Sequence, residues 1–315
     1  MNSNGSHGSV HDEKSGGVAN PLVSVIIPHF NDEDVIDRAL KSVDAQTYEP
    51  IEIVLIDSSQ SDRLATLGAE RTDIIYKYQE PSGIASARNY GISVATGEFI
   101  AFLDADDEWL PTKLTQQLTA IQDGADIVYS DVIVVKDGFN HRLNSLSLSD
   151  SDDPHIEFFI EGGVPCSTIV ARKSCFSQEN FDESLRVGED MHMWVRLFRA
   201  FQPAAIHEPL AYYYRRENSL TSDVYRLCED ELEIIEDLCS RFPELNSYRR
   251  TVEAKSEYKL GKRLLRTGNY RAARGPLFSS IQKGFVDIRG VSLLAVSLLP
   301  IGHQRIMRIL ERLGS

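Results

Sequence analysis

The chain has 315 residues, of which 42% are hydrophobic and 25% charged, and its formal net charge is −14 at pH 7. This composition is typical of a soluble globular protein, and the length fits one α/β domain of roughly 200 residues with a smaller second one. Non-specific nucleic-acid binding needs basic surface patches, so the excess of acidic residues indicates that no nucleic acid is a partner.

Residues 1–20 are rich in Ser, Gly, Asn and His and have no apolar core, so we expect a disordered tail that is neither signal peptide nor anchor. No run of 18 apolar residues predicts a membrane-spanning helix. The four cysteines have no CxxC pair and no metal-ligand spacing, which indicates reduced, structural thiols in a cytosolic protein. They are Cys166, Cys175, Cys228 and Cys239.

Continuous apolar runs at residues 23–27, 51–56 and 99–103 predict strands that are buried on both faces, and residues 74–78 predict a shorter one. Between the first two runs, apolar residues at helical spacing predict an amphipathic helix. They are Val35, Ile36, Ala39, Leu40 and Val43. Alternating strands and helices of this kind predict a mainly parallel sheet with helices on both faces.

Parallel strands in this order bring residues 28–31, 57–59 and 104–107 to the same edge of the sheet, where ligands bind in such folds. We therefore expect a nucleotide site there. The first strand is followed by PHFND, without the GxGxxG of dinucleotide-binding dehydrogenases, and the chain has no GxxxxGKS phosphate loop.

Three carboxylates follow the strand at residues 99–103, namely Asp104, Asp106 and Asp107. They cannot all stay ionised close together without a counter-charge, and a divalent cation is the usual partner. Alternatively, they cap the helix that starts near Thr112, because acidic residues are favoured at helix N-termini.

Arg88 and Asn89 lie on the helix before this strand, and Arg88 shifts the balance towards a ligand site. A cation and an arginine near one strand end suit a diphosphate.

Glu189 and Asp190 form a second acidic pair, after a glycine and before the helical pattern MHMWVRLFRA. Spacing alone favours a role as helix-capping acids over a chemical one.

Residues 126–135 predict a strand, residues 137–154 a polar surface loop, and residues 155–160 the start of a short helix. A further strand is expected in CSTIVAR, at residues 166–172. From residue 225 the pattern is helical, and residues 258–284 resemble a single tetratricopeptide-like helix pair that turns at Gly268 and Asn269.

The apolar stretch at residues 291–300 is too short to span a bilayer. Arg305, Arg308 and Arg312 follow it. The stretch either packs on the catalytic domain or lies in a membrane interface with these arginines on anionic lipid.

Four segments in this order resemble the signature of the family 2 glycosyltransferases, which have the GT-A fold: VSVIIPHFND, EIVLIDSSQSD, GIASARNYGISVATGEFIAFLDADDEW and FDESLRVGEDMHMWVRL. The resemblance runs from about residue 23 to about residue 221. It implies an α/β fold with a mixed, mainly parallel sheet, a catalytic domain at 21–222 after the tail at 1–20, and a helical extension at 223–315. It also implies a nucleotide-diphospho sugar donor, a divalent metal, Mn²⁺ or Mg²⁺, and inversion at the anomeric carbon.

The resemblance implies that Pro28, Phe30 and Asn31 border the nucleoside and that Asp57 helps to position it. Many relatives have a second aspartate, which can bond a uracil ring, where this chain has Ser58. A UDP-sugar is therefore one candidate donor among several.

Carried over in the same way, Arg88 approaches the nucleotide, Asp104 meets the ribose or the metal, and Asp106 is the metal ligand proper. The GED motif places a carboxylate beside the acceptor hydroxyl, where it serves as general base. Asp190 is the expected base, and Glu189 is the alternative.

Other positions stay open. Relatives often have an acid where this chain has His192, and Ser167 and Thr168 either line the acceptor pocket or are ordinary strand hydroxyls. Arg215 or Arg216 touches a phosphate or forms a solvated turn. His29, His192 and His207 are expected to have roles other than metal ligation.

The resemblance predicts a metal-assisted, inverting glycosyltransferase that acts on a saccharide or lipid-linked acceptor, in the cytoplasm or peripherally at the membrane through the tail. A non-catalytic GT-A domain that binds a nucleotide or a partner is the alternative, which the presence of both DAD and GED disfavours. A nucleotidyltransferase would need a glycine-rich basic loop after the first strand.

Overall fold

The computed structural model describes residues 20–31, 33–59, 61–136, 139–148, 151–215, 224–285 and 288–298. Its strands are β1 (Val23–His29), β2 (Ile51–Asp57), β3 (Ile74–Tyr78), β4 (Phe99–Phe102), β5 (Glu108–Trp109), β6 (Ile127–Lys136), β7 (Phe139–Leu143), β8 (Val170–Arg172) and β9 (Pro203–Tyr214). Its α-helices are α1 (Ile36–Asp44), α2 (Asp62–Glu70), α3 (Ile84–Val94), α4 (Lys113–Gln122), α5 (Pro154–Glu161), α6 (Glu189–Ala200), α7 (Val224–Arg241), α8 (Asn246–Arg266), α9 (Tyr270–Gln282) and α10 (Ile288–Leu298). Short 3₁₀ turns are η1 (Cys166–Thr168), η2 (Lys173–Phe176) and η4 (Pro243–Leu245).

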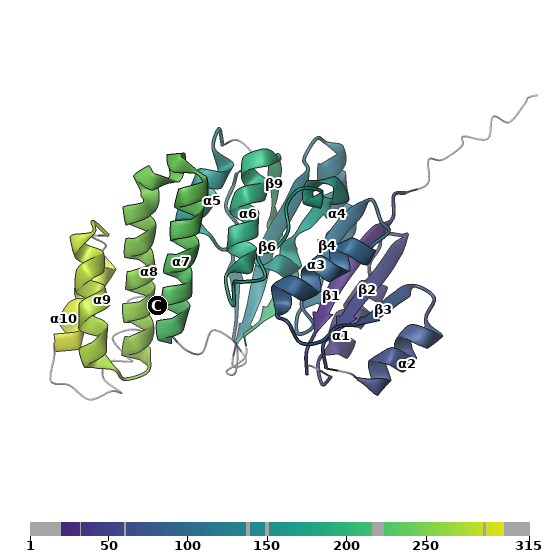
Figure 1. The fold of residues 1–315 in the computed structure, drawn as a ribbon, viewed down its shortest axis with the longest axis horizontal. Helices are drawn as coiled ribbons and strands as arrows, with labels where there is room; N and C mark the ends of the chain where they lie inside the picture. Colours follow the sequence, from purple (N-terminus) through teal and green to yellow (C-terminus); the bar gives the residue numbers. More distant parts are fainter. Residues whose placement is uncertain are drawn as a thin grey trace, which may run out of the picture.

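In the described part of the chain, the strands form one mixed sheet in the order β3-β2-β1-β4-β8-β6-β9-β5, and β7 pairs with β6. The pairs among β1, β2, β3 and β4 are parallel, whereas β8 runs antiparallel to both β4 and β6. Figure 1 shows the sheet with helices packed around it and α7 to α10 extending from one side. This architecture confirms the mixed, mainly parallel sheet with a helical extension that the sequence predicts.

Side chains of β1 alternate between two hydrophobic cores because successive residues of a strand point to opposite faces. Val25 and Ile27 contribute to the core shared with α1, α2 and α4, while Ile26 contributes to the core shared with α3, α5 and α6. Helix α3 lies close against β1 at Gly91, where an added Cβ would be 2.5 Å from Cγ2 of Ile26. This close approach sets the position of α3 above the end of the sheet.

Helix α7 packs into the main hydrophobic core, because Ile234, Ile235 and Leu238 are buried in the same cluster as α6 and the sheet. A second, smaller core joins α8, α9 and α10 and includes Cys228 of α7. The expected domain boundary at 222 falls at residues 216–223, outside the described part of the chain. Most of the expected N-terminal tail also lies outside it, at 1–19.

The polar-loop prediction for residues 137–154 was wrong in part, because this segment contains β7, which pairs with β6. All five residues of β7 are exposed, so no apolar face marks it in the sequence. The strand expected at 166–172 begins with the η1 turn and is extended only in β8. The predicted helix-pair turn is confirmed, since α8 ends at Arg266, α9 begins at Tyr270, and Gly268 has a φ of 80°.

Within the described residues, no helix has the length and apolar character needed to cross a bilayer. The four cysteines are buried, and none forms a disulfide.

Candidate active site

The carboxyl ends of β1, β2 and β4 meet at one edge of the sheet. His29 is the register partner of Asp57 in β2, and Ile26 is the partner of Phe102 in β4. The loops that follow these strands therefore start side by side, which confirms the convergence expected from the sequence.

Asp57 is fully buried and anchors the loop after β2. Its Oδ1 lies 3.0 Å from Nδ1 of His29 and accepts hydrogen bonds from the backbone and hydroxyl of Ser59 at 2.9 and 2.8 Å. Its Oδ2 accepts from the Ser61 backbone at 2.8 Å and the Tyr76 hydroxyl at 2.9 Å. Burial raises the pKa of Asp57, but these hydrogen bonds outweigh it and lower the pKa to about 2. Asp57 thus holds the loop after β2 in place.

The residues expected around the nucleoside are more accessible. Phe30 is 55% exposed, and Asn31 is exposed with a left-handed φ of 57°. Pro28 and Ser58 are half-buried, and the Ser58 backbone donates to the His29 carbonyl oxygen at 2.9 Å. An exposed aromatic ring at this edge offers a surface on which a base can stack.

Arg88 on α3 is buried and joins two carboxylates. Its Nη2 donates to Asp104 Oδ1 at 2.8 Å, and its Nη1 donates to Glu189 Oε1 at 2.5 Å. Its guanidinium carbon lies 5.5 Å from the centre of the Phe181 ring, and Asn89 fixes the backbone of Phe181 through bonds of 2.8 and 2.9 Å. Arg88 therefore connects the end of β4 to the start of α6, whereas Asn89 braces the intervening loop.

The three aspartates after β4 have different environments. Asp107 is fully buried, and it accepts from the Ser167 hydroxyl at 2.5 Å and the Tyr214 backbone at 3.0 Å. Burial, together with the charges of Asp104 and Asp106, holds the pKa of Asp107 well above its usual range. Asp104 and Asp106 are partly exposed, so their carboxylates are accessible from solvent, unlike that of Asp107.

These aspartates do not cap α4. The helix begins at Lys113, its N-cap residue is Thr112, and no acidic residue lies in its first turn. The alternative explanation of the DAD motif as a helix cap is therefore wrong.

The arrangement fits a divalent cation that is completed by a ligand. In the described part of the chain, no three His, Cys, Asp or Glu side chains form a ready-made metal cluster. Cations such as Mg²⁺ are commonly held by one or two carboxylates together with substrate phosphates, and do not need an all-protein cage. Asp106, with the Asp104 oxygen that does not meet Arg88, provides such a pair.

Sequence reasoning missed Arg38 on α1. Its Nη2 donates to the carbonyl oxygen of Asp106, and its guanidinium lies 3.6 Å from the centre of the Tyr214 ring. The Tyr214 hydroxyl donates in turn to Glu108 at 2.9 Å. Nothing in the spacing of these residues connects them, because they come from three distant parts of the chain.

Glu189 and Asp190 open α6, and Gly188 before them adopts a left-handed φ of 74°. Glu189 is engaged by Arg88, whereas Oδ1 of Asp190 accepts from the Met191 backbone at 2.7 Å. Burial and the charge of Glu189 raise the pKa of Asp190 to about 7, although Arg88 opposes the rise. A carboxylate with a pKa near neutrality is suited to accepting a proton at physiological pH.

Other candidates from the sequence have structural contacts. The Thr168 hydroxyl donates to the Pro165 carbonyl oxygen at 2.7 Å, and the Arg215 backbone donates to that of Val135 at 3.0 Å. Arg216 lies outside the described residues. Ser167, whose role the sequence left open, bridges the aspartate loop, since its hydroxyl donates to Asp107 and also accepts from the Asp104 backbone at 3.1 Å.

Two further histidines lie beside aspartates. Nε2 of His192 is 2.8 Å from Oδ2 of Asp237, and Nδ1 of His207 is 3.9 Å from Oδ1 of Asp131. His192 is therefore directed towards α7.

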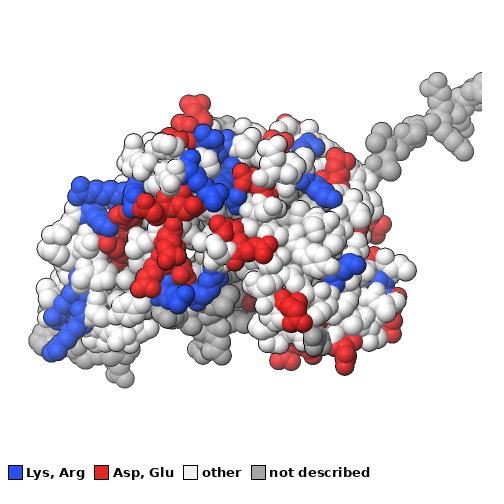
Figure 2. All heavy atoms as spheres, in the orientation of Figure 1, with Lys and Arg blue, Asp and Glu red and all other residues white. Residues whose placement is uncertain are grey.

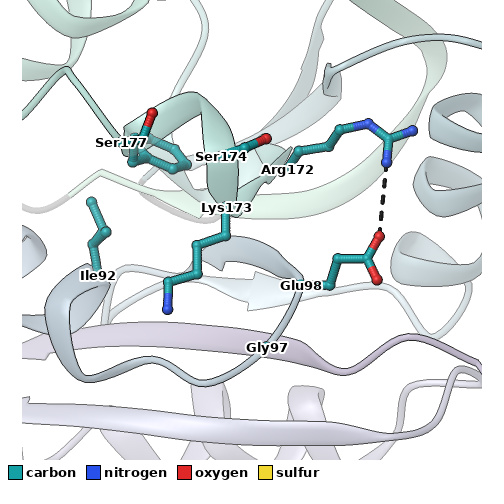
Figure 3. Close-up of a pocket in the computed structure, with 8 residues that line it drawn as sticks. Ile92, Gly97, Glu98, Arg172, Lys173, Ser174 and Ser177 are labelled. Carbon is teal, nitrogen blue, oxygen red and sulfur yellow. Dashed lines mark ion pairs between the residues drawn. The ribbon is translucent and has the colours of Figure 1, made fainter.

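A cavity of about 440 Å³ lies at the opposite end of the parallel strands from the candidate site, at the amino end of β4 (Figure 3). It is lined by Ile92, Gly97, Glu98, Arg172, Lys173, Ser174, Phe176 and Ser177. Arg172 pairs with Glu98 at 3.9 Å, and Lys173 donates to the Ala95 carbonyl oxygen at 2.6 Å. Because Glu98 precedes the strand that Asp104 follows, this cavity is separate from the candidate site.

Residues 24–185 match the model of the family described as glycosyl transferase family 2. The chain is 30% identical over 208 residues to the amylovoran biosynthesis glycosyltransferase AmsB of Erwinia amylovora, covering 61% of this chain and 69% of that protein. It is 27% identical over 299 residues to the GalNAc(5)-diNAcBac-PP-undecaprenol beta-1,3-glucosyltransferase of Campylobacter jejuni, covering 89% and 94%.

Among solved structures, S. aureus TarS 1–349 in complex with UDP-GlcNAc has a TM-score of 0.58 and 19% identity, covering 87% of this chain and 84% of that one. The mannosyltransferase PcManGT from Pyrobaculum calidifontis, in complex with GDP-Man and Mn²⁺, has a TM-score of 0.56 and 14% identity, covering 88% and 79%. At these identities the likeness concerns the fold. The family match at 24–185 spans the ends of β1, β2 and β4 and stops before Asp190.

Proposed function

The chain belongs to glycosyl transferase family 2 and is a glycosyltransferase, and from this premise we propose that it moves a sugar from a nucleotide-diphospho donor to an acceptor hydroxyl with inversion. The observation that carries this proposal is the Arg88 bridge. One buried guanidinium bonds Asp104 on the donor side and Glu189 beside the proposed base. Arg88 thereby joins the segment of the proposed donor site to the segment that carries the proposed base.

On the donor side, we propose that Phe30 stacks on the base while Pro28, Asn31 and Ser58 border the nucleoside. The exposure of Phe30 supports this role. Asp57 would act through the loop that it anchors, because its own oxygens are buried and bonded. A UDP-sugar is one candidate donor, consistent with Ser58 as a neutral hydrogen-bonding group.

Asp106, with Asp104 beside it, would hold a divalent metal, Mn²⁺ or Mg²⁺. The fit rests on the partial exposure of both carboxylates at the strand ends. When bound, such an ion neutralises charge on the diphosphate leaving group. Arg88 holds Asp104 at the same place, and because the guanidinium is buried this charge-assisted hydrogen bond is screened little by solvent.

On the acceptor side, Asp190 would act as general base. Its carboxylate removes the hydroxyl proton while the acceptor oxygen forms a bond to the anomeric carbon on the face opposite the diphosphate. The bond from that carbon to the phosphate oxygen breaks, and the nucleoside diphosphate leaves. Glu189 is less suited to this role, because its oxygen is already bonded to Arg88.

The acceptor class follows from the relatives by analogy. Two of them are named as transferases that act on undecaprenol-linked diphosphate saccharides. We propose a saccharide or lipid-linked acceptor at the cytoplasmic face of a membrane. Val291, Ala295 and Leu298 on α10 support peripheral contact, because they recur at helical spacing and are exposed.

A screen of nucleotide sugars against the purified chain tests the function, with release of nucleoside diphosphate in Mn²⁺ as the readout. We expect one donor to be selected and Asp190→Asn to lower its turnover by about 10²- to 10⁴-fold with little change in donor affinity. Glu189→Gln is the matched comparison. Loss in Glu189→Gln but not in Asp190→Asn would transfer the role of base to Glu189, and full activity in both would refute a catalytic role for the motif.

A further inference from the structure

One face of α7 lies against the segment that carries the proposed base. Asp230, Ile234 and Asp237 are spaced at i, i+4 and i+7, so they lie along one side of the helix. Nη2 of Arg186, just before the GED motif, donates to Asp230 at 2.7 Å. Asp190 thus follows a segment that is attached to α7 at its start.

The contact with Ile234 is a close steric one. Gly188 has no side chain, and a Cβ placed there would be only 2.6 Å from Cδ1 of Ile234. Gly188 also has a φ of 74°, a conformation that side chains rarely adopt. Ile234 is 1% exposed, so its Cδ1 fills the space beside the residue that starts the turn into α6.

On the other side of the base, His192 reaches the same face of α7. Its ring is 1% exposed, and Nε2 lies 2.8 Å from Asp237 Oδ2. Asp237 is also 2.7 Å from Nε of Arg241, one turn further along α7. Contacts with α7 therefore occur both before and after Asp190, within a few residues on each side.

We propose that α7 is a positioning element for the catalytic base, and that its Ile234 and Asp237 side chains hold Asp190 where it meets the acceptor hydroxyl. This inference rests on the proposed function, because it takes Asp190 as the base. It makes the start of the helical extension part of the catalytic unit. A base misplaced by about 1 Å loses roughly 100-fold in rate, so contacts of this kind matter to turnover without touching substrate.

The chain offers matched variants for a test. Ile234→Val removes the single methyl that meets Gly188, and Ile235→Val makes the same change at an adjacent buried residue. Asp237→Ala removes the partner of His192, and Glu233→Ala removes an exposed carboxylate of the same helix. Figure 2 shows acidic side chains gathered over the region of α7 and α8, with basic side chains beside them.

Two readouts in the full chain separate positioning from general stability. The first is hydrogen–deuterium exchange of the amides at 186–192, with those at 104–107 as reference. The second is turnover and KM for the nucleotide sugar that the screen selects. We expect Ile234→Val and Asp237→Ala to increase exchange at 186–192 alone and to lower turnover by about 10- to 100-fold, with KM for the donor changed less than about threefold.

Asp237→Asn keeps an oxygen that can pair with His192, so it should recover most of the turnover lost in Asp237→Ala. Ile235→Val and Glu233→Ala should behave as the wild type. Wild-type exchange and turnover in both Ile234→Val and Asp237→Ala would overturn the inference. If these variants are active and Asp190→Asn is not, only the inference fails; if Asp190→Asn itself is fully active, the assignment of the base fails first.

Discussion

Nη1 of Arg88 lies 2.5 Å from Oε1 of Glu189, although 101 positions separate the two residues. The same guanidinium bonds Asp104, which follows β4. A buried cation with one carboxylate on each side ties the carboxyl end of β4 to the start of α6. Neither side can shift far without breaking a charge-assisted hydrogen bond.

Replacing Arg88 by alanine should therefore affect both stability and donor binding. Removing one partner of a buried ion pair costs about 3–5 kcal/mol, because the other charge stays buried without compensation. We expect urea denaturation to show a loss of that size in the free energy of unfolding, with weaker nucleotide binding. Arg88→Ala combined with Glu189→Gln should recover part of the stability, and equal stability of the single and double variants would contradict this explanation.

Asp106→Ala should remove the metal dependence of nucleotide binding. Calorimetric titration of UDP and GDP with and without Mn²⁺ measures it directly. In the wild type we expect tighter binding with Mn²⁺, and in Asp106→Ala the same weak binding in both conditions. Asp123→Ala, an exposed carboxylate after α4, is the control. A Mn²⁺ effect that survives in Asp106→Ala argues against this residue as a ligand.

The pH dependence of turnover should report Asp190. Its pKa is raised to about 7, and a base must be deprotonated to act, so turnover should rise with pH through about 7 and level off above it. Steady-state rates between pH 5.5 and 8.5 at saturating donor would show this. The residual turnover of Asp190→Asn should not rise with pH in this range. If its turnover still rises with the same midpoint pH, the rise belongs to another titrating group.

Asp57 contributes to stability, and its pKa is shifted in the opposite direction to that of Asp190. Its pKa is lowered from 3.8 to about 2, so the stability that it provides is fully present above about pH 4 and is lost as the pH falls towards 2. Asp57→Ala leaves buried donors unpaired at about 1–3 kcal/mol each, so its unfolding free energy at pH 7 should be lower by at least about 2 kcal/mol. Chemical denaturation at pH 7, 4 and 2.5 should show the difference between wild type and variant narrowing as the pH falls.

The exposed apolar stripe of α10 should promote membrane contact. Val291→Glu with Leu298→Glu places charges where the stripe would meet lipid, so less protein should sediment with phosphatidylglycerol vesicles at low salt. Ala272→Glu adds a charge at an exposed position of α9 and is the control. If the unmodified chain stays in the supernatant, peripheral binding is not a property of this tail.

Local sequence was sufficient to predict the strands that are buried along their whole length. The apolar runs at 23–27, 51–56 and 99–103 became β1, β2 and β4, because strands covered on both faces are apolar throughout. Once these strands are parallel, their polar ends must converge. The convergence of these strand ends could therefore be predicted without any knowledge of packing.

The roles of individual polar residues could not be read in the same way. Nothing local distinguishes Asp107, which is buried against Ser167, from Asp106, which is partly exposed. The contact of Arg38 with the Asp106 carbonyl and the contact of Asp237 with His192 depend on how separate helices pack. Such pairs are set by tertiary structure alone, and β7 was missed because its only signature is backbone pairing with β6.

The chain direction reverses between β4 and β8, so the loop after β4 and the segment before β8 lie at the same end of the two strands. Because β8 is antiparallel to β4, the segment that leads into β8 arrives at the edge where β4 ends, and it brings Ser167 beside the aspartates. Under the proposed function, the nucleotide would meet loops that leave parallel strands, whereas the chain that enters β8 would supply the opposite wall. Under the proposed function, changes in the segment that enters β8 would act first on the acceptor side, and changes after β1 and β2 on the nucleotide side.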